Sequence, residues 1–271
     1  MKPVGIITDS CSGISQKEAS ERGIFVLPMP FYIEGHCLYE GVDLDRDEFL
    51  EKLKEGADVS TSQPSPVEVT ALWDRVLSEY EKVLYMPISS GLSGSCETAY
   101  ALTRDEKYEG RVLVVDHGQV ATPLHRMVLD ALELVEKGYT AEEIRELLER
   151  ASDQMMIYIG VQTLEYLKKG GRITPAAAAL GAVFNIKPVL KLATGKLDSF
   201  KKCHGFLKAR KIMIEAMKHE IETRFQEAYE AGAVHILAAS SASEAETESW
   251  VKEIEAAFLS LIHISEPTRP Y

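Results

Sequence analysis

The sequence has no long apolar run. No stretch approaches the roughly 18–20 apolar residues that cross a bilayer, and the opening MKPVGIITDS has no signal-peptide core. We therefore expect a cytoplasmic protein. The chain of 271 residues, with 45% hydrophobic and 27% charged residues, is long enough for one large or two ordinary globular domains.

Cysteine is scarce, and its spacing argues against two kinds of site. The chain has four scattered cysteines, at positions 11, 37, 96 and 203, and they are never paired at the spacing of a metal site. We expect neither a disulfide framework nor a metal site. The dinucleotide-binding pattern Gly-x-Gly-x-x-Gly and the P-loop are absent too, so no cofactor is expected.

Basic residues are outnumbered along the chain but not everywhere in it. Lysine and arginine number 30 against 42 acidic residues, and the net charge of −12 argues against general nucleic-acid binding. Residues 168–211, here called the basic segment, hold 11 lysines and arginines and a single acid, Asp198. Such a segment is either a solvated face or a surface that meets an anion.

The order of apolar runs predicts an α/β protein with two domains. Over residues 1–153, strand-like runs such as KVLYMPI alternate with helix-like runs, which is typical of a parallel sheet. One of these helices should start at Thr140, with Glu143 completing a capping box. Residues 154–259 should form a second α/β domain with a mixed sheet: two strands around Thr194-Gly195, a long helix over 206–232 and a strand over 233–240.

Polar residues follow three of the predicted strands. They are Asp9-Ser10, Ser89-Ser90 and Asp116-His117. Because ligands in parallel sheets bind at the carboxyl ends of strands, we expect these residues to converge on one edge.

The stretch ISSGLSGS, residues 88–95, joins a strand to a helix and allows three interpretations. Ser90 would cap the helix in the plainest of them. In the second, Ser93 and Ser95 lie in the first turn, where free N–H groups and the helix dipole favour a carboxylate or phosphate. A catalytic Ser93 is the third, but the nucleophile pattern Gly-x-Ser-x-Gly lacks its final glycine. A hydrolase therefore stays only as an alternative.

Two further stretches carry anion-binding chemistry. STSQPSP, residues 60–66, is a second hydroxyl-rich loop before a helix, which favours a shared anion pocket over two ordinary caps. LKKGGRIT, residues 167–174, either ends a helix at its glycines or presents Arg172 to a carboxylate or phosphate.

Five motifs in order, ITDSCSGIS, TSQPSP, ISSGLSGSCETA, TLEYLKKGGRIT and NIKPVL, resemble the DegV family of bacterial fatty-acid-binding proteins from about residue 3 to residue 259. The resemblance implies that one long-chain fatty acid is buried between two domains. It also implies that Thr61 and Ser93 hold its carboxylate. The partner would be a fatty acid kinase that makes an acyl-phosphate for phospholipid synthesis, so the chain would be a carrier and not an enzyme. A peripheral membrane contact fits this role.

The neighbours of these motifs suggest further binding residues, namely Ser62, Gly94, Arg172 and His204. His204 stands where family members commonly have arginine, which puts the role of that arginine in doubt here. The His-x-Gly-Pro-Gly motif near the family's carboxyl end is absent from this chain. We expect residues 260–271 to be a non-native tail, and another amphipathic carboxylate stays open as the ligand.

Overall fold

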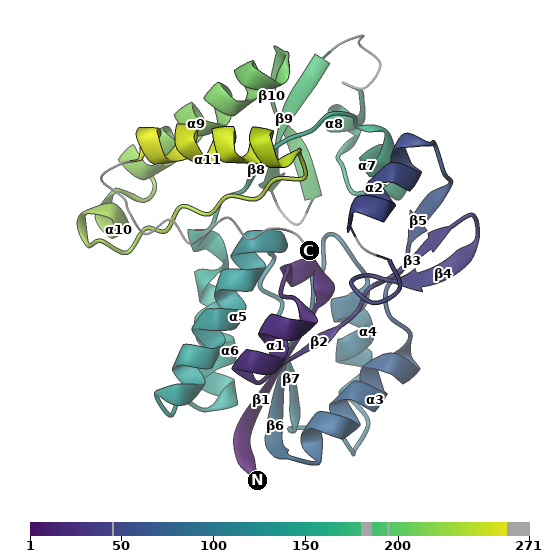
Figure 1. Ribbon diagram of the computed structural model, residues 1–271. Coiled ribbons are helices and arrows are strands. Elements are labelled where there is room, and N and C mark those ends of the chain that lie inside the picture. The colour runs from purple at the N-terminus through teal and green to yellow at the C-terminus, as the bar shows by residue number, and fades with distance from the viewer. Residues whose placement is uncertain (45, 180–185, 194–195, 259–271) are drawn as a thin grey trace. The chain divides into compact units, whose positions relative to one another are not determined.

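The computed structural model describes residues 1–44, 46–179, 186–193 and 196–258 (Figure 1). They divide into two compact units, Met1–Asp153 and a second that begins at Gln154, and each is described by itself. None of the described helices is long and apolar enough to cross a membrane. The expected tail, 260–271, lies outside the described residues.

A parallel sheet forms the centre of the first unit. Its strand order is β2-β1-β6-β7, and every neighbouring pair runs parallel. The strands are β1 (Lys2–Asp9), β2 (Ile24–Leu27), β6 (Tyr80–Met86) and β7 (Val112–Val114). The helices around it are α1 (Gln16–Arg22), α3 (Pro66–Leu77), α4 (Ser95–Leu102), α5 (Ala121–Glu136) and α6 (Ala141–Ala151). The predicted α/β class with a parallel sheet is confirmed.

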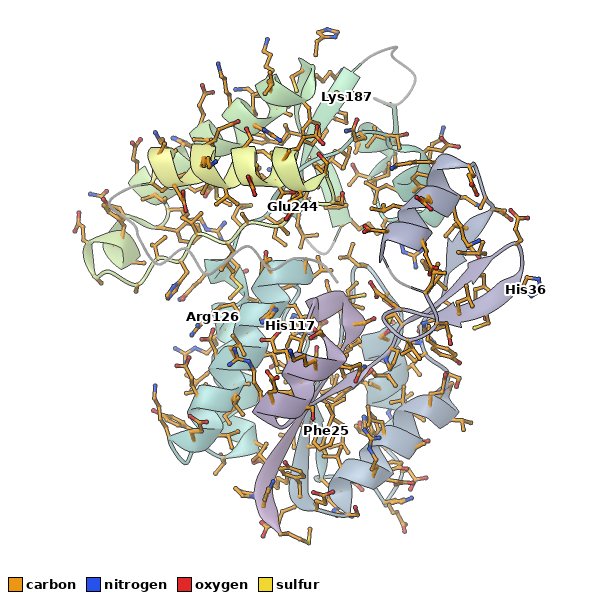
Figure 2. All side chains as sticks on the ribbon, in the orientation of Figure 1. Phe25, His36, His117, Arg126, Lys187 and Glu244 are labelled. Atoms are coloured by element: carbon orange, nitrogen blue, oxygen red, sulfur yellow. The ribbon has the colours of Figure 1, made fainter. Side chains whose placement is uncertain are left out.

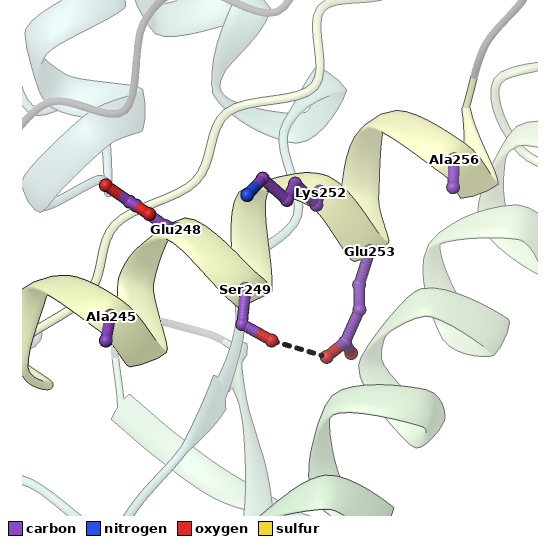
Figure 3. Close-up of a pocket in the computed structure, with 6 residues that line it drawn as sticks. All are labelled: Ala245, Glu248, Ser249, Lys252, Glu253 and Ala256. Atoms are coloured by element: carbon purple, nitrogen blue, oxygen red, sulfur yellow. Dashed lines mark hydrogen bonds between the residues drawn. The ribbon is translucent and has the colours of Figure 1, made fainter.

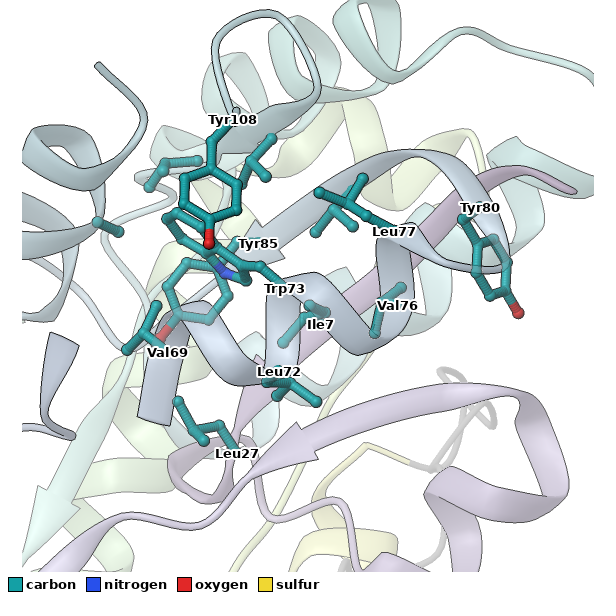
Figure 4. Packing of buried hydrophobic residues seen from close by; sticks show 14 of the residues in the cluster. Ile7, Leu27, Val69, Leu72, Trp73, Val76, Leu77, Tyr80, Tyr85 and Tyr108 are labelled. Atoms are coloured by element: carbon teal, nitrogen blue, oxygen red, sulfur yellow. The ribbon is translucent and has the colours of Figure 1, made fainter. Parts of the chain in front are cut away.

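Helices bury both faces of this sheet. α5 and α6 contact β1, β6 and β7 on one face, and α3 and α4 pack against β6 and β7 on the other (Figure 1). On the second face the buried Trp73 ring meets Tyr85 and Tyr108 edge to face, with centroids 5.6 and 5.2 Å apart (Figure 4). Close-packed aromatic rings of this kind hold strands and helices rigidly together, so the strand ends have fixed positions.

A small antiparallel sheet of order β4-β3-β5 also belongs to the first unit. Its elements are β3 (Pro30–Ile33), β4 (His36–Tyr39) and β5 (Val59–Thr61), with α2 (Arg46–Lys54) beside them. The hairpin turn between β3 and β4 has positive φ at both Glu34 and Gly35, the geometry that two-residue hairpins prefer. Phe49 of α2 packs edge to face on Phe31 at 5.4 Å.

The apolar run IFVLPMPFYIEG, residues 24–35, contains two prolines, which predict an edge strand or an interrupted one. It is interrupted: β2 pairs with β1 in the parallel sheet, whereas β3 pairs with β4 and β5. Pro28 and Pro30 lie at the break, and neither has an N–H to donate to a sheet.

The second unit is built on a three-stranded sheet of order β10-β9-β8. The strands β8 (Tyr158–Gly160), β9 (Ile186–Ala193) and β10 (Lys196–His204) pair antiparallel, and a parallel bridge joins Ile173 to Leu197. The helices are α7 (Glu165–Gly170), α8 (Pro175–Ala179), α9 (Phe206–Glu222), α10 (Gln226–Glu230) and α11 (Glu244–Ala257). β9 and β10 are the two strands predicted around Thr194-Gly195, which themselves lie outside the described residues.

Two expectations for this unit are wrong. The long helix predicted over 206–232 is broken, because α9 ends at Glu222 and α10 starts at Gln226. The strand predicted over 233–240 does not form in the described part of the chain. Val234, Ile236 and Ala238 alternate as in a strand, but they pack on a cluster formed with α9 and α11 instead of pairing with a neighbouring strand.

Candidate functional site

The carboxyl ends of three parallel strands meet at one polar edge of the first unit. The loop after β6 begins there, and each of its first three N–H groups has an acceptor from another strand end. Ile88 donates to Asp9 Oδ2 at 2.7 Å, and Ser90 donates to Asp116 Oδ1 at 3.3 Å. Ser89 donates to the carbonyl oxygen of Gln119 at 3.0 Å. The expected convergence of these polar residues is confirmed.

Asp9 is the most deeply buried acceptor of this edge. Its side chain is fully buried, and Oδ1 accepts the N–H of Cys11 at 3.0 Å. Burial raises the pKa of Asp9 to about 7, although the N–H groups of Ile88 and Cys11 act in the opposite direction. Asp9 thus connects the turn after β1 to the loop after β6.

His117 is the second buried titratable group at this edge (Figure 2). Its Nδ1 accepts the N–H of Gln119 at 3.0 Å. Burial lowers the pKa of His117 to about 4, so the ring is neutral near pH 7. A neutral ring with this hydrogen bond shapes the turn that presents the Gln119 carbonyl to Ser89.

The loop of residues 88–94 ends in a helix start that differs from the expected one. α4 begins at Ser95 with Gly94 as its N-cap, and the cap has no side-chain hydrogen bond. The expectation that Ser90 caps the helix is wrong, because Ser90 lies five residues before it and is fixed by Asp116. Ser93 also lies before the helix. Its Oγ is 2.9 Å from Ser95 Oγ and accepts the N–H of Ser95 at 3.3 Å.

The second hydroxyl-rich loop, residues 61–65, leads from the small sheet into α3. Thr61 is exposed at the end of β5, and its hydroxyl has no hydrogen bond among the residues that the structure describes. Ser62 donates its N–H to Pro30 O at 3.2 Å and its hydroxyl to Gln63 O at 3.1 Å. Ser65 caps α3 in a capping box with Glu68. The hydroxyl of Ser65 therefore caps α3, whereas the hydroxyl of Thr61 can bind a ligand.

Gln63 brings the two loops together. Its Nε2 donates to Thr98 Oγ1 in the first turns of α4 at 2.8 Å. Its Oε1 lies only 2.6 Å from the point that a Cβ would occupy at Gly94. Through Gln63, the structure thus brings the loop that holds Thr61 and Ser62 against the loop that ends at Gly94. Gln63 was not among the residues predicted from the sequence. The only signal for it there is its position inside the motif TSQPSP.

This edge is suited to a carboxylate. The first N–H groups of a helix have no intrahelical acceptor, and α4 has no side-chain cap on its N-cap residue. The positive end of the helix dipole favours an anion there. Together with the Ser93 and Thr61 hydroxyls, these groups can donate several hydrogen bonds to one carboxylate.

The other two sequence-predicted residues belong to the second unit and lie far from each other. Arg172 is half-buried after the glycines that end α7, and its guanidinium donates to the carbonyl oxygen of Gly170. Its own carbonyl oxygen accepts the N–H of Leu197, near the start of β10, at 3.1 Å. His204 is exposed at the far end of that strand. A strand advances about 3.3 Å per residue, so roughly 20 Å separates the two ends.

A shallow hollow on α11 offers no comparable chemistry. It is lined by residues of that helix alone: Ala245, Glu248, Ser249, Lys252, Glu253 and Ala256 (Figure 3). Its two carboxylates would repel an anionic ligand. Among the described residues, no group of three or more histidine, cysteine or acidic side chains is placed to hold a metal.

Comparison with protein families gives one match over almost the whole chain. Residues 3–266 match the profile described as "Uncharacterised protein, DegV family". A DegV domain-containing protein of Caldanaerobacter subterraneus subsp. tengcongensis is 30% identical over 265 residues, which cover 98% of this chain and 90% of the relative. Another, from Deinococcus radiodurans, is 33% identical over 219 residues, or 80% of this chain and 77% of the relative.

Solved structures show the same likeness. A DegV family protein from Thermus thermophilus, described by its fatty acid binding, is 30% identical with a TM-score of 0.80, covering 98% of this chain and 90% of that one. A stearic acid-binding protein from Eubacterium ventriosum superimposes with a TM-score of 0.83 over the same shares. At 20% identity, the second comparison shows the fold alone.

Proposed function

The chain belongs to the DegV family, and from this premise we propose that it binds one long-chain fatty acid and presents the carboxylate to a separate fatty acid kinase. The kinase would convert the carboxylate into an acyl-phosphate for phospholipid synthesis. The protein would be a cytoplasmic carrier with a peripheral contact to the membrane, and it would not be an enzyme.

The shared edge of the two hydroxyl loops carries the proposal. Thr61 has a hydroxyl without a partner among the described residues, and Ser93 lies beside the start of α4 on the other loop. Gln63 contacts both loops. Both hydroxyls can donate to a carboxylate. Gly94 adjoins Ser93 and can add its backbone N–H group, and Ser62 adjoins Thr61, although its own N–H is donated to Pro30 O.

The acyl chain would supply most of the affinity. Burying a methylene group gains about 0.8 kcal/mol, so a long chain gains far more than the hydrogen bonds to its head group. The polar edge then decides which end of the ligand is exposed, and it distinguishes a fatty acid from an alcohol or ester of equal length. Arg172 and His204 belong to the proposal as residues that act on the phosphoryl group or on the kinase.

A hydrolase that uses Ser93 as its nucleophile is the alternative function, and the surroundings of Ser93 argue against it. A nucleophilic serine needs a base within hydrogen-bond reach. Ser93 Oγ has hydrogen bonds only to Ser95 among the residues that the structure describes, and Ser95 is no base.

Native mass spectrometry of the purified protein tests the proposal. A bound species with the mass of a fatty acid, released on denaturation, is the expected result. An empty protein that fails to take up added fatty acid, and that reacts at Ser93 with a fluorophosphonate, would support the hydrolase instead.

A further inference from the structure

Gln63 occupies an unusual place for a polar side chain at a binding edge. It comes from the loop of Thr61, yet its amide nitrogen is hydrogen-bonded to α4 and its amide oxygen lies against Gly94, next to Ser93. Nε2 donates to Thr98 Oγ1 at 2.8 Å, and Oε1 fills the space beside the Cα of Gly94. We infer that Gln63 is a positioning residue: it locks the loop of Thr61 against the loop of Ser93, so that two hydroxyls from separate loops can hold one carboxylate. This inference rests on the proposed function.

The absence of a side chain at residue 94 is part of this arrangement. A Cβ there would lie 2.6 Å from Gln63 Oε1, closer than non-bonded atoms approach. Gly94 has φ −73° and ψ 2°, which an L-residue adopts without strain. The glycine is therefore needed for the room it gives the amide of Gln63 and not for its backbone freedom.

An alanine at residue 94 would push the amide away. The colliding atom is the far end of a flexible side chain, so the fold can absorb Gly94→Ala by turning the Gln63 amide out. That movement breaks the hydrogen bond to Thr98. Gly94→Ala and Gln63→Ala should thus have the same consequence, which is an unlocked pair of loops.

The Thr61 loop is also fixed at its two ends, because Thr61 pairs with Phe31 in the small sheet and α3, which follows the loop, packs against α4. Ser62 is tied back to Pro30 in the small sheet, and Ser65 is engaged with α3. Neither bond reaches α4. Gln63 supplies the direct hydrogen bond from this loop to α4, so it sets the final spacing between the hydroxyls of Thr61 and Ser93. Hydrogen bonds to a carboxylate weaken quickly once the spacing changes.

The experiment compares two ligands of equal chain length, myristate and myristyl alcohol. The ratio of their dissociation constants reports recognition of the carboxylate, while a loss of stability or of the acyl site would weaken both ligands alike. Gln63→Ala, Gly94→Ala and Thr98→Val should each lower the preference for myristate by roughly tenfold, about one hydrogen bond to a charged group. Thr98→Ser keeps the hydroxyl and should rescue the preference.

A double-mutant cycle makes the test specific. Once Gln63→Ala has removed the amide, Gly94→Ala should have no further effect on the ratio, so the two changes should be strongly non-additive. Alanine is a poorer N-cap of α4 than glycine, but Gly94→Ala introduces this loss both with and without Gln63, so it cancels in the coupling energy of the cycle. Thr103→Val, which makes the same change at the other end of α4, is the matched control and should leave the ratio unchanged.

The outcomes separate the two proposals. Additive losses at residues 63 and 94, or an unchanged ratio in Thr98→Val, overturn the lock while leaving fatty-acid binding intact. A wild-type protein without preference for myristate over the alcohol overturns the proposed function and the binding part of this inference. The contact between Gln63 and Gly94 does not need the ligand. The same double-mutant cycle, measured on the melting temperature of the ligand-free protein, should therefore also show coupling between residues 63 and 94.

Discussion

The polar edge of the first unit and the basic segment of the second use their charged groups in opposite ways. At the edge, Asp9 and Asp116 accept backbone N–H groups, and Asp9 is fully buried. In the basic segment six lysines are exposed, and their ammonium groups have neither an ion pair nor a hydrogen bond among the described residues: Lys168, Lys196, Lys201, Lys202, Lys208 and Lys211. Charges that face the interior fix a loop, whereas charges that face the solvent are free to meet a partner.

The largest expected effect concerns Asp9. Its pKa is about 7 in the folded protein, whereas an unfolded aspartate has a pKa near 3.8. The folded state therefore binds the proton more tightly, and the resulting stability is fully present below pH 4 and lost as the pH rises through 7. Relative to Asp9→Asn, which cannot titrate, the wild type should lose about 4 kcal/mol of unfolding free energy between pH 4 and pH 8.

Urea unfolding of both proteins across this pH range measures the loss. Asp43 is the matched control, since its carboxylate also accepts a backbone N–H, from Tyr39 at 2.8 Å, but is exposed. Asp43→Asn should keep the pH dependence of the wild type. If Asp9→Asn also keeps it, the buried carboxylate does not titrate in this window, and the contrast with solvent-facing charges loses its main support.

His117 should act at the same edge with the opposite sign. Burial lowers its pKa to about 4, from 6.5 for an ordinary histidine. The stability from the neutral ring is fully present above pH 6.5 and is lost as the pH falls through 4. Relative to His117→Phe, the wild type should lose about 3 kcal/mol between pH 7 and pH 4, measured by the same unfolding series. His36→Phe, on the exposed β4 strand, should not change the pH dependence.

How far the sequence predicts this edge depends on the distance over which each contact acts. The capping box of Thr140 and Glu143 is present as predicted, because it joins residues three apart and the chain alone decides it. The cap at Ser90 fails because α4 starts five residues later, while Asp116, which follows another strand, accepts the N–H of Ser90. Gln63 is 35 residues from Thr98, and nothing in either local pattern predicts their contact.

The same reasoning explains the second unit. The pattern of residues 233–240 alternates as in a strand, but a strand also needs a neighbour with free N–H and carbonyl groups. Here the alternating side chains Val234 and Ile236 are buried by packing against helices, without a neighbouring strand. The convergence at the first sheet was predictable because parallel strands place all their carboxyl ends on one edge.

The third prediction tests whether the fixed edge is the binding edge. Thr61→Ala and Ser93→Ala should each weaken fatty-acid binding by about 1.5–3 kcal/mol, because each removes one hydrogen bond to a charged group. Isothermal titration or displacement of a fluorescent fatty acid measures the effect. Ser78→Ala is a matched control, since among the described residues the Ser78 hydroxyl bonds only to Arg75 O, near the end of α3. Unchanged affinity in both variants would reject Thr61 and Ser93 as the carboxylate ligands.

The smallest expected effect concerns the lysines that face the solvent. An exposed charge pair contributes about 0.2–1 kcal/mol, so Lys201→Glu/Lys202→Glu should raise the KM of a fatty acid kinase for the loaded protein several-fold. Salt screens exposed charges, and the difference should vanish near 0.5 M salt, where the Debye length is only about 4 Å. Lys17→Glu/Lys252→Glu makes the same change in net charge on other exposed surfaces, α1 and α11. An equal rise in KM for both pairs would mean that the kinase senses only net charge, and the basic segment would then be a solvated face.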